Sequence, residues 1–301
     1  MRNGATLIRP IPVWLLRIVW ITLPLTAGPA AAAALRDWSD TPQLVGEVLL
    51  WLAWAAGLLA TLAPRPETLT ALRTIAPAFA VFAIAAAADG RPSASASIGA
   101  VTATVVAAAL ASGHDIAIAA ANAIAYGDEQ RVLLRVPPAL FLAPIPVARA
   151  LVVAVVVGGP LLLADGRTVP GVAVLVIGAP LVYLLVRALH GLSLRWTVLV
   201  PAGFVVVDRM TLADPVLFLR ERIVAMSAVD PGPAPEGALD LRLGATLGSV
   251  VLWFDEEAEL FRAVRRRRTD TVRTRGVCVA VVRRGELLRA AAARRLPVRE
   301  G

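Results

Sequence analysis

The sequence has few of the residues on which most protein chemistry depends. It contains no lysine, one cysteine (Cys278) and two histidines, His114 and His190. A lone cysteine excludes an internal disulfide, and the two histidines lie far apart without cysteines or acidic clusters beside them. We therefore expect no zinc or di-metal centre. All 30 basic residues are arginine, a bias that we attribute, with the abundance of alanine, to a GC-rich genome.

Recognisable catalytic, nucleotide-binding and nucleic-acid-binding motifs are also missing from the sequence. The carboxylates Asp255, Glu256, Glu257 and Glu259 have no partner histidine or nucleophile nearby in the sequence, so we do not interpret them as catalytic. We therefore expect no catalytic residue, no cofactor and no nucleic-acid partner. These absences favour a protein that is not an enzyme, but they do not exclude an enzyme.

Apolar residues are abundant in the sequence. Hydrophobic residues make up 58% of the chain and the mean hydropathy is +0.72, values too high for an ordinary soluble domain. About six apolar stretches have the roughly 17–25 residues needed to cross a bilayer, and they cover about residues 12–35, 43–63, 69–88, 94–112, 139–164 and 169–187. The sequence therefore predicts a membrane-spanning helical bundle over residues 1–193.

The first stretch allows two interpretations. Arg2 and Arg9 before an apolar run that ends in Ala30–Ala34 resemble a secretory signal peptide with a small-residue cleavage site. Arg17, however, interrupts the run, and residues 11–35 are long enough to span. We favour an uncleaved first helix and keep the cleaved signal peptide as the alternative.

Arginine counts in the short loops predict the orientation, because cytoplasmic loops carry an excess of positive charge. One set of helix ends carries Arg2, Arg9, Arg65, Arg73, Arg131, Arg135, Arg187 and Arg195, whereas the other carries Arg36, Arg91 and Arg167. We expect the first set to be cytoplasmic. The protein is then a multi-pass protein of a bacterial plasma membrane, with the lipid bilayer as its partner and both termini in the cytoplasm.

Polar residues are scarce inside the predicted spans. Glu47 is a candidate functional residue because an intramembrane carboxylate is costly, although at a span's edge it more often meets water or headgroups. We expect Arg17 to reach the opposite interface and to make no ion pair with Glu47. Small residues in 94–112 indicate close helix packing rather than a pore, and the prolines of 139–146 indicate a short piece before the fifth span.

The longer segment between the fourth and fifth spans contains Tyr126 and then the mixed charges of Asp128, Glu129, Arg131 and Arg135. A functional interpretation makes it a docking or switch loop for a partner protein. The plainer interpretation is an interfacial elbow in which Asp128 and Glu129 pair with Arg131 and Arg135. We favour the elbow. His190, where the last span ends, is likewise interpreted as structural rather than as a pH sensor.

From Leu194 the pattern changes to strand-length apolar runs, which predict a mainly-β domain over residues 194–301, a small barrel or sandwich with a C-terminal helix at 286–296. Expected strands cover residues 194–200, 204–207, 216–219, 222–228, 239–243, 249–254 and 276–282. The acids at 255–259 followed by Arg262 predict a short helix or a charged loop. The block Arg265, Arg266, Arg267 and Arg268 is a candidate site for anionic lipid headgroups, and a plain solvated loop is its alternative.

Parts of the chain resemble known families. Two stretches of the chain resemble an uncharacterised family of actinobacterial multi-pass membrane proteins. The first contains Tyr126–Glu129, Arg131, Leu134-Arg135 and Pro137. The second contains His190–Ser193, Arg195-Trp196, Val200–Gly203, Asp208 and Thr211–Val216. That resemblance implies no activity. The C-terminal part is similar to bacterial pleckstrin-homology-like domains in its strand order after Trp196, in its terminal helix, and in Arg195-Trp196 with Asp208-Arg209. This resemblance implies membrane-proximal assembly or lipid contact and identifies no ligand.

Three functions follow from these features, in decreasing order of support. The first is a non-enzymatic membrane scaffold that presents its cytoplasmic β domain to a protein partner or to anionic lipid. The second is a transporter or channel component, which the proline- and glycine-interrupted fifth span and the small-residue fourth span favour. The third is a membrane enzyme acting on lipid-linked substrates, with Asp128 and Glu129 as its only candidate residues.

Overall fold

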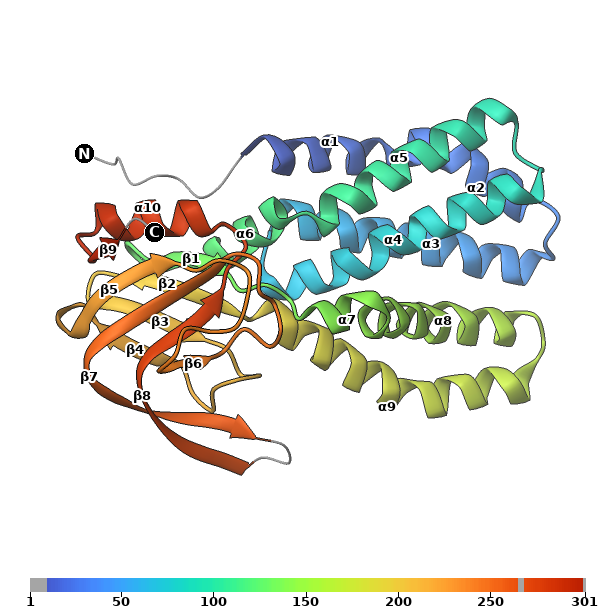
Figure 1. Cartoon of the computed structure of the whole chain (residues 1–301). Helices are drawn as coiled ribbons and strands as arrows, with labels where there is room; N and C mark the ends of the chain where they lie inside the picture. The colour runs from blue at the N-terminus through green and yellow to red at the C-terminus, as the bar shows by residue number, and fades with distance from the viewer. Residues whose placement is uncertain (1–9, 265–267, 300–301) are drawn as a thin grey trace. The chain divides into compact units, whose positions relative to one another are not determined.

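The computed structural model describes residues 10–264 and 268–299, and for residues 264, 268 and 269 it describes only the backbone. These residues form two compact units. A helical unit contains residues 10–120 and 144–193, and a sheet unit contains residues 121–143 and 194–299. Within the described residues, the chain therefore passes between the two units three times (Figure 1).

The helical unit consists of long apolar helices, as the sequence predicts. They are α1 (Pro10–Thr26), α2 (Gly28–Leu35), α3 (Asp40–Leu62), α4 (Pro66–Asp89), α5 (Ala94–Ser112), most of α6 (His114–Asn122), α8 (Pro144–Ala164) and α9 (Thr168–Ser193). Six segments are long and apolar enough to cross a membrane: Pro10–Leu35, Asp40–Leu62, Pro66–Asp89, Ala94–Ser112, Pro138–Ala164 and Thr168–Ser193. The six expected long apolar helices are confirmed, and the last one extends to Ser193.

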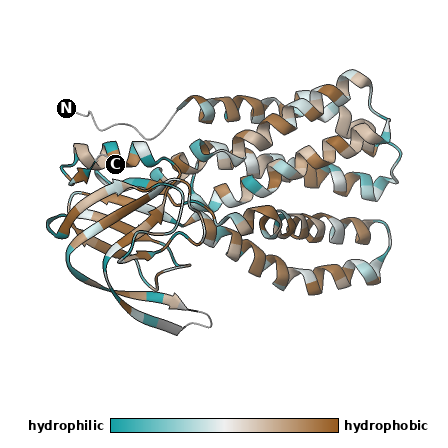
Figure 2. Ribbon diagram, viewed as in Figure 1, coloured by the Kyte–Doolittle hydropathy of each residue, from teal (hydrophilic) through white to brown (hydrophobic). Residues whose placement is uncertain are grey.

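The helices present apolar side chains outward and small ones inward. Figure 2 shows hydrophobic colouring along most of their length, and Ile11, Leu25 and Val169 are each more than three-quarters exposed. The buried side of α5 is a stripe of Ala100, Thr104, Ala107 and Ala111, and α5 packs against α4. Small side chains let helix backbones approach closely, which is consistent with the contact between α4 and α5.

The first span is interrupted where α1 ends at Thr26 and α2 begins at Gly28. Pro24 lies inside α1 and has no N–H, so the carbonyl of Trp20, four residues earlier, loses its helical donor. Trp54 of α3 replaces that donor, because its Nε1 donates to the Trp20 carbonyl at 2.9 Å. In return, Trp20 Nε1 donates to the Trp54 carbonyl at 2.9 Å. Gly57 leaves room for the fully buried Trp20 indole, which a Cβ there would overlap.

The sheet unit contains two sheets. The first is antiparallel, in the order β1 (Gln130–Leu133), β2 (Trp196–Val200), β3 (Gly203–Val207), β4 (Val216–Leu219). The second has the order β6 (Ala238–Asp240), β8 (Arg268–Ala280), β7 (Ser249–Val264), β5 (Ile223–Ala228), β9 (Val298–Arg299). A 3-10 turn (Arg220–Arg222) precedes β5, α10 (Arg284–Ala293) packs on β5, and the short α7 (Pro138–Leu142) precedes α8.

Strand β1 comes from the segment between the fourth and fifth spans and joins both sheets. It pairs with β2 from Gln130↔Leu199 to Leu133↔Trp196. Immediately afterwards, Leu134 bridges to Val281, and the backbone N–H of Arg135 donates to the Ala280 carbonyl at 2.8 Å. Phe218 of β4 stacks on Phe254 of β7 with ring centroids 4.5 Å apart, which connects the sheets a second time. The mixed sheet unit and its terminal helix are thus present, and residues 121–143 belong to it together with the C-terminal part.

The expectation of a short helix or charged loop after residue 254 is wrong. Residues 255–264 continue β7, and β8 pairs with them from Ala258↔Thr274 to Val264↔Arg268 after a register shift that follows Trp253. The two strands run on as a two-stranded arm (Figure 1). The acids and bases face each other across the strands, as in Glu259↔Arg273 and Arg262↔Asp270, and opposite charges at such positions stabilise a sheet.

Candidate functional site

A buried ion pair holds the start of β2 to the end of β3. Arg195 is 2% exposed and Asp208 is also 2% exposed. The guanidinium donates from Nε to Asp208 Oδ1 and from Nη2 to Oδ2, each at 2.8 Å, and from Nη1 to the Arg135 carbonyl at 3.0 Å. Asp208 also accepts hydrogen bonds from the Met210 N–H and the Thr211 hydroxyl. The residues that carry the pleckstrin-homology-like resemblance are therefore a structural clamp.

The candidate docking loop is largely fastened into the sheet unit. Asn122 accepts from the Arg131 N–H at 2.9 Å and donates to the Arg131 carbonyl at 2.8 Å, as a neighbouring strand would. Arg131 also pairs with Glu129 at 3.2 Å and lies over the Trp196 ring, 5.1 Å from its centroid. The expected pairing of Glu129 with Arg131 is confirmed.

The three other loop residues, Asp128, Arg135 and Tyr126, differ in exposure and contacts. The main-chain carbonyl of Asp128 accepts a hydrogen bond from Arg294, which also donates to the Leu199 carbonyl at 3.1 Å. Arg135 has its backbone N–H and carbonyl engaged by Ala280 and Arg195. Tyr126 is 87% exposed, so within this loop it is the side chain best placed to contact a partner.

The arginine block follows β7 in the sequence and ends at the first residue of β8. Arg265, Arg266 and Arg267 lie outside the described residues, and Arg268 is the first residue of β8 with its side chain outside the description. The described part of the arm is anchored along its edge: the Ala213 N–H donates to the Phe261 carbonyl and the Ala263 N–H to the Thr211 carbonyl. Phe261 itself is 51% exposed.

A second charge cluster, around the buried Arg242, could not be recognised from the sequence. Arg242, 3% exposed, donates to both oxygens of Asp240 and to the Ser249 hydroxyl. Hydrogen bonding from this guanidinium lowers the pKa of Asp240 below its ordinary value. Burial raises the pKa of the neighbouring Cys278 thiol to about 11, with Arg242 opposing the shift. A fully buried thiol with this pKa is a poor nucleophile, so the cluster is structural.

His190 takes part in a small hydroxyl cluster within the helical unit. Its Nδ1 lies 3.4 Å from both Thr70 Oγ1 and Ser193 Oγ, and Ser193 donates to the His190 carbonyl at 2.7 Å. No group of three or more histidine, cysteine or acidic residues among those described could hold a metal ion. The contacts of His190 connect the ends of α4 and α9.

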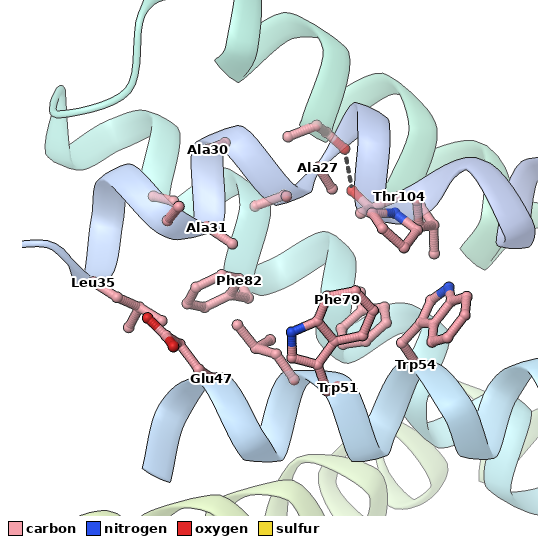
Figure 3. A pocket seen from close by; sticks show the side chains of 18 residues that line it. Ala27, Ala30, Ala31, Leu35, Glu47, Trp51, Trp54, Phe79, Phe82 and Thr104 are labelled. Atoms are coloured by element: carbon pink, nitrogen blue, oxygen red, sulfur yellow. Dashed lines mark hydrogen bonds between the residues drawn. The ribbon is translucent and has the colours of Figure 1, made fainter. Parts of the chain in front are cut away.

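Glu47 lies at one end of a cavity in the helical unit. The cavity has a volume of about 260 Å³ and lies among α1, α2, α3, α4 and α5. One wall is aromatic, with Trp51 and Trp54 from α3 and Phe79 and Phe82 from α4 (Figure 3). The remaining lining residues are Leu23, Pro24, Ala27, Gly28, Ala30, Ala31, Ala32, Leu35, Leu50, Ala83, Ala86, Ala100 and Thr104.

Glu47 and Arg17 make separate contacts, as expected. Gln43 Nε2 donates to Glu47 Oε1 at 3.0 Å. Arg17 Nε donates to the Thr61 carbonyl at 2.9 Å, in the last turn of α3. Glu47 and Thr61 lie on the same helix, separated by about 21 Å at 1.5 Å per residue. The carboxylate therefore remains as the charged group of the cavity.

No protein-family model matches this chain, and the comparisons with curated proteins and with solved structures give no match. The arguments about its function therefore rest on its own residues. Two places carry them: the arm of the sheet unit, and the cavity that contains Glu47. The sequence indicated both the arginine block and Glu47, but not the cavity, whose lining comes from residues between Leu23 and Thr104.

Proposed function

We propose that this protein is a multi-pass protein of a bacterial plasma membrane, and that it serves as a non-enzymatic scaffold. Its sheet unit, similar to pleckstrin-homology-like domains, binds anionic lipid headgroups at the cytoplasmic surface. The exposed apolar faces of the helices support the membrane assignment, because lipid is the surrounding in which side chains such as Val169, at 82% exposure, are favourable.

The arrangement of strands supports the proposed similarity of the sheet unit to pleckstrin-homology-like domains. A four-stranded antiparallel sheet is followed by the β5, β7 and β8 strands and then by α10. The chain enters this unit once between two spans and again after the last span. Repeated entry restricts the unit to the membrane face from which those spans emerge.

The observation that carries the lipid-binding proposal is the arm. Its strands β7 and β8 are joined through Arg265–Arg268, and Phe261 on β7 is half exposed. Each basic residue near an anionic membrane surface contributes about 1 kcal/mol to the free energy of membrane binding, and an aromatic side chain can enter the membrane interface. Four arginines thus supply about 4 kcal/mol, or roughly a thousandfold in affinity.

Hydrogen–deuterium exchange of the full chain in nanodiscs tests this proposal. We expect arm amides over residues 255–275 to exchange more slowly in discs containing phosphatidylglycerol than in purely zwitterionic discs, and high salt should remove the difference. Replacing Arg265–Arg268 with alanine should also remove it.

A matched control changes the net charge equally elsewhere in the sheet unit. Arg209, Arg289, Arg295 and Arg299 are exposed and lie outside the arm, and their replacement with alanine should preserve most of the protection. Equal exchange of the wild-type arm in both kinds of disc would reject lipid binding by the arm, and the scaffold would then need a protein partner, for which Tyr126 is the first residue to change.

A further inference from the structure

The cavity in the helical unit has one charged end and otherwise apolar walls. Among the described residues that line it, Glu47 is the only ionisable one. Figure 3 shows Glu47 near Leu35 at one end of the lined space, with Trp54 and Thr104 toward the other. Between Glu47 and Trp54 the α3 axis rises by about 10 Å. The space is therefore an elongated slot that runs from a carboxylate into an aromatic and aliphatic interior.

We infer that this cavity binds a small amphipathic cation, an alkylammonium compound whose charged nitrogen lies at Glu47 and whose apolar body lies between the aromatic wall and the alanine-rich wall. The ligand class follows from charge and surface chemistry. An ionised carboxylate only accepts hydrogen bonds, and the single donation from Gln43 leaves it with acceptor capacity for a cationic head.

The aromatic wall favours the same class of ligand. The faces of tryptophan and phenylalanine rings attract cations within about 6 Å, and Trp51 lies one turn beyond Glu47 on α3. An anionic amphiphile would be repelled by Glu47. A neutral one would leave the carboxylate with the Gln43 hydrogen bond and no opposite charge beside apolar walls, which costs free energy.

The small wall explains why the slot exists. Around the interruption between α1 and α2, Ala27, Gly28, Ala30 and Ala31 present little side-chain volume. The Trp20–Trp54 hydrogen bonds fix the distance between α1 and α3, so these two helices cannot move closer together and fill the slot. Trp51 lines the slot and is 59% exposed, so the aromatic wall extends to the outside of the helical unit.

Equilibrium dialysis with octylammonium tests the inference, with the full chain in zwitterionic nanodiscs and empty discs as the background. We expect saturable binding of one molecule per chain. Glu47→Gln should weaken it by about tenfold or more, the loss of a charge-assisted contact. Ala31→Leu, which fills the slot without changing charge, should also weaken it. Glu67→Gln, an exposed carboxylate at the start of α4, should bind as the wild type does.

Two probes of equal chain length separate charge from hydrophobicity. Octan-1-ol and octyl sulfate should show no saturable binding above the empty-disc background. Equal binding of either probe, or unchanged ammonium binding in Glu47→Gln, would overturn the inference. Thermal unfolding of each variant in the same discs shows whether it is folded, and Ala31→Leu provides a second measurement if Glu47→Gln does not fold. The result is independent of the arm and of its lipid binding.

Discussion

At the scale of single residues, several arginines of this protein satisfy main-chain carbonyls. Arg17 donates to the Thr61 carbonyl in the last turn of α3. Arg73 donates to the carbonyls of Ala111, Ser112 and Gly113, where α5 ends. The last carbonyls of a helix lack helical donors and carry partial negative charge. In the predicted topology both helix ends are cytoplasmic, so Arg73, one of the arginines from which the orientation is predicted, also completes a helix end.

The buried Arg195–Asp208 pair leads to a prediction about stability. Arg195→Met keeps an apolar stem but leaves the Asp208 carboxylate buried without its partner, which costs about 3–5 kcal/mol. We expect a large drop in the urea midpoint at which the sheet unit becomes sensitive to trypsin, measured on the full chain in nanodiscs.

Arg222→Met is the control for that measurement. Arg222 pairs with Glu256 at 2.7 Å, but the two side chains are 55% and 68% exposed. A solvent-exposed pair contributes less than about 1 kcal/mol, so the midpoint should hardly move. A similar midpoint for both variants would show that the clamp does not stabilise the sheet unit.

At the scale of elements, helix α1 depends on a neighbour for its own hydrogen bonding. Trp54→Phe removes the donor that replaces the N–H missing at Pro24. We expect the variant to lose about 1–2 kcal/mol of stability, the cost of an unpaired buried carbonyl. Pro24→Ala restores a helical donor to the Trp20 carbonyl, so the double variant should recover part of the loss.

Thermal unfolding of the four proteins forms a double-mutant cycle. Trp51→Phe is the matched control, since Trp51 lies on the same helix and is 59% exposed. Additive effects of Trp54→Phe and Pro24→Ala would contradict the proposed replacement of the donor.

The elements also show where sequence patterns are sufficient and where they are not. Alternating or continuous apolar runs such as Phe204–Val207 predicted strands close to those observed. Strand β1 was missed, because four residues beginning Gln130-Arg131 have no clear period, and their partners lie more than 60 positions away. Residues 255–264 were expected to be helix or loop, since acids and bases at spacings of three and four suit a helix as well as a cross-strand ladder.

At the scale of the whole molecule, the interleaving of the two units is the main feature. Residues 121–143 are in the sheet unit, whereas residues 144–193 between them and β2 are in the helical unit. A fragment that begins at Leu194 would lack β1 and would expose the edge of β2, and unpaired strand edges promote aggregation. Experiments on the sheet unit therefore require the full chain.

The predicted orientation can be tested by labelling introduced cysteines. We expect Ser39→Cys, in the loop after the first span, to react with a membrane-impermeant maleimide on intact cells. Tyr126→Cys, in the loop after the fourth span, should react only after permeabilisation. The native Cys278 should remain unlabelled because it is fully buried and its pKa is raised to about 11. The reverse labelling pattern would place the sheet unit outside the cytoplasm.

The sequence by itself determined the number of long apolar helices, their approximate bounds and most strands, because hydrophobic periodicity and run length are local properties of the chain. It also indicated Glu47 and the arginine block, since a charged residue can be identified from the sequence whatever its tertiary contacts. The tertiary structure decided that Gln130–Leu133 completes the first sheet, that Arg195 pairs with Asp208, and that Glu47 lies at the end of an aromatic slot. Each depends on which distant residues pack together, and neither composition nor periodicity specifies those contacts.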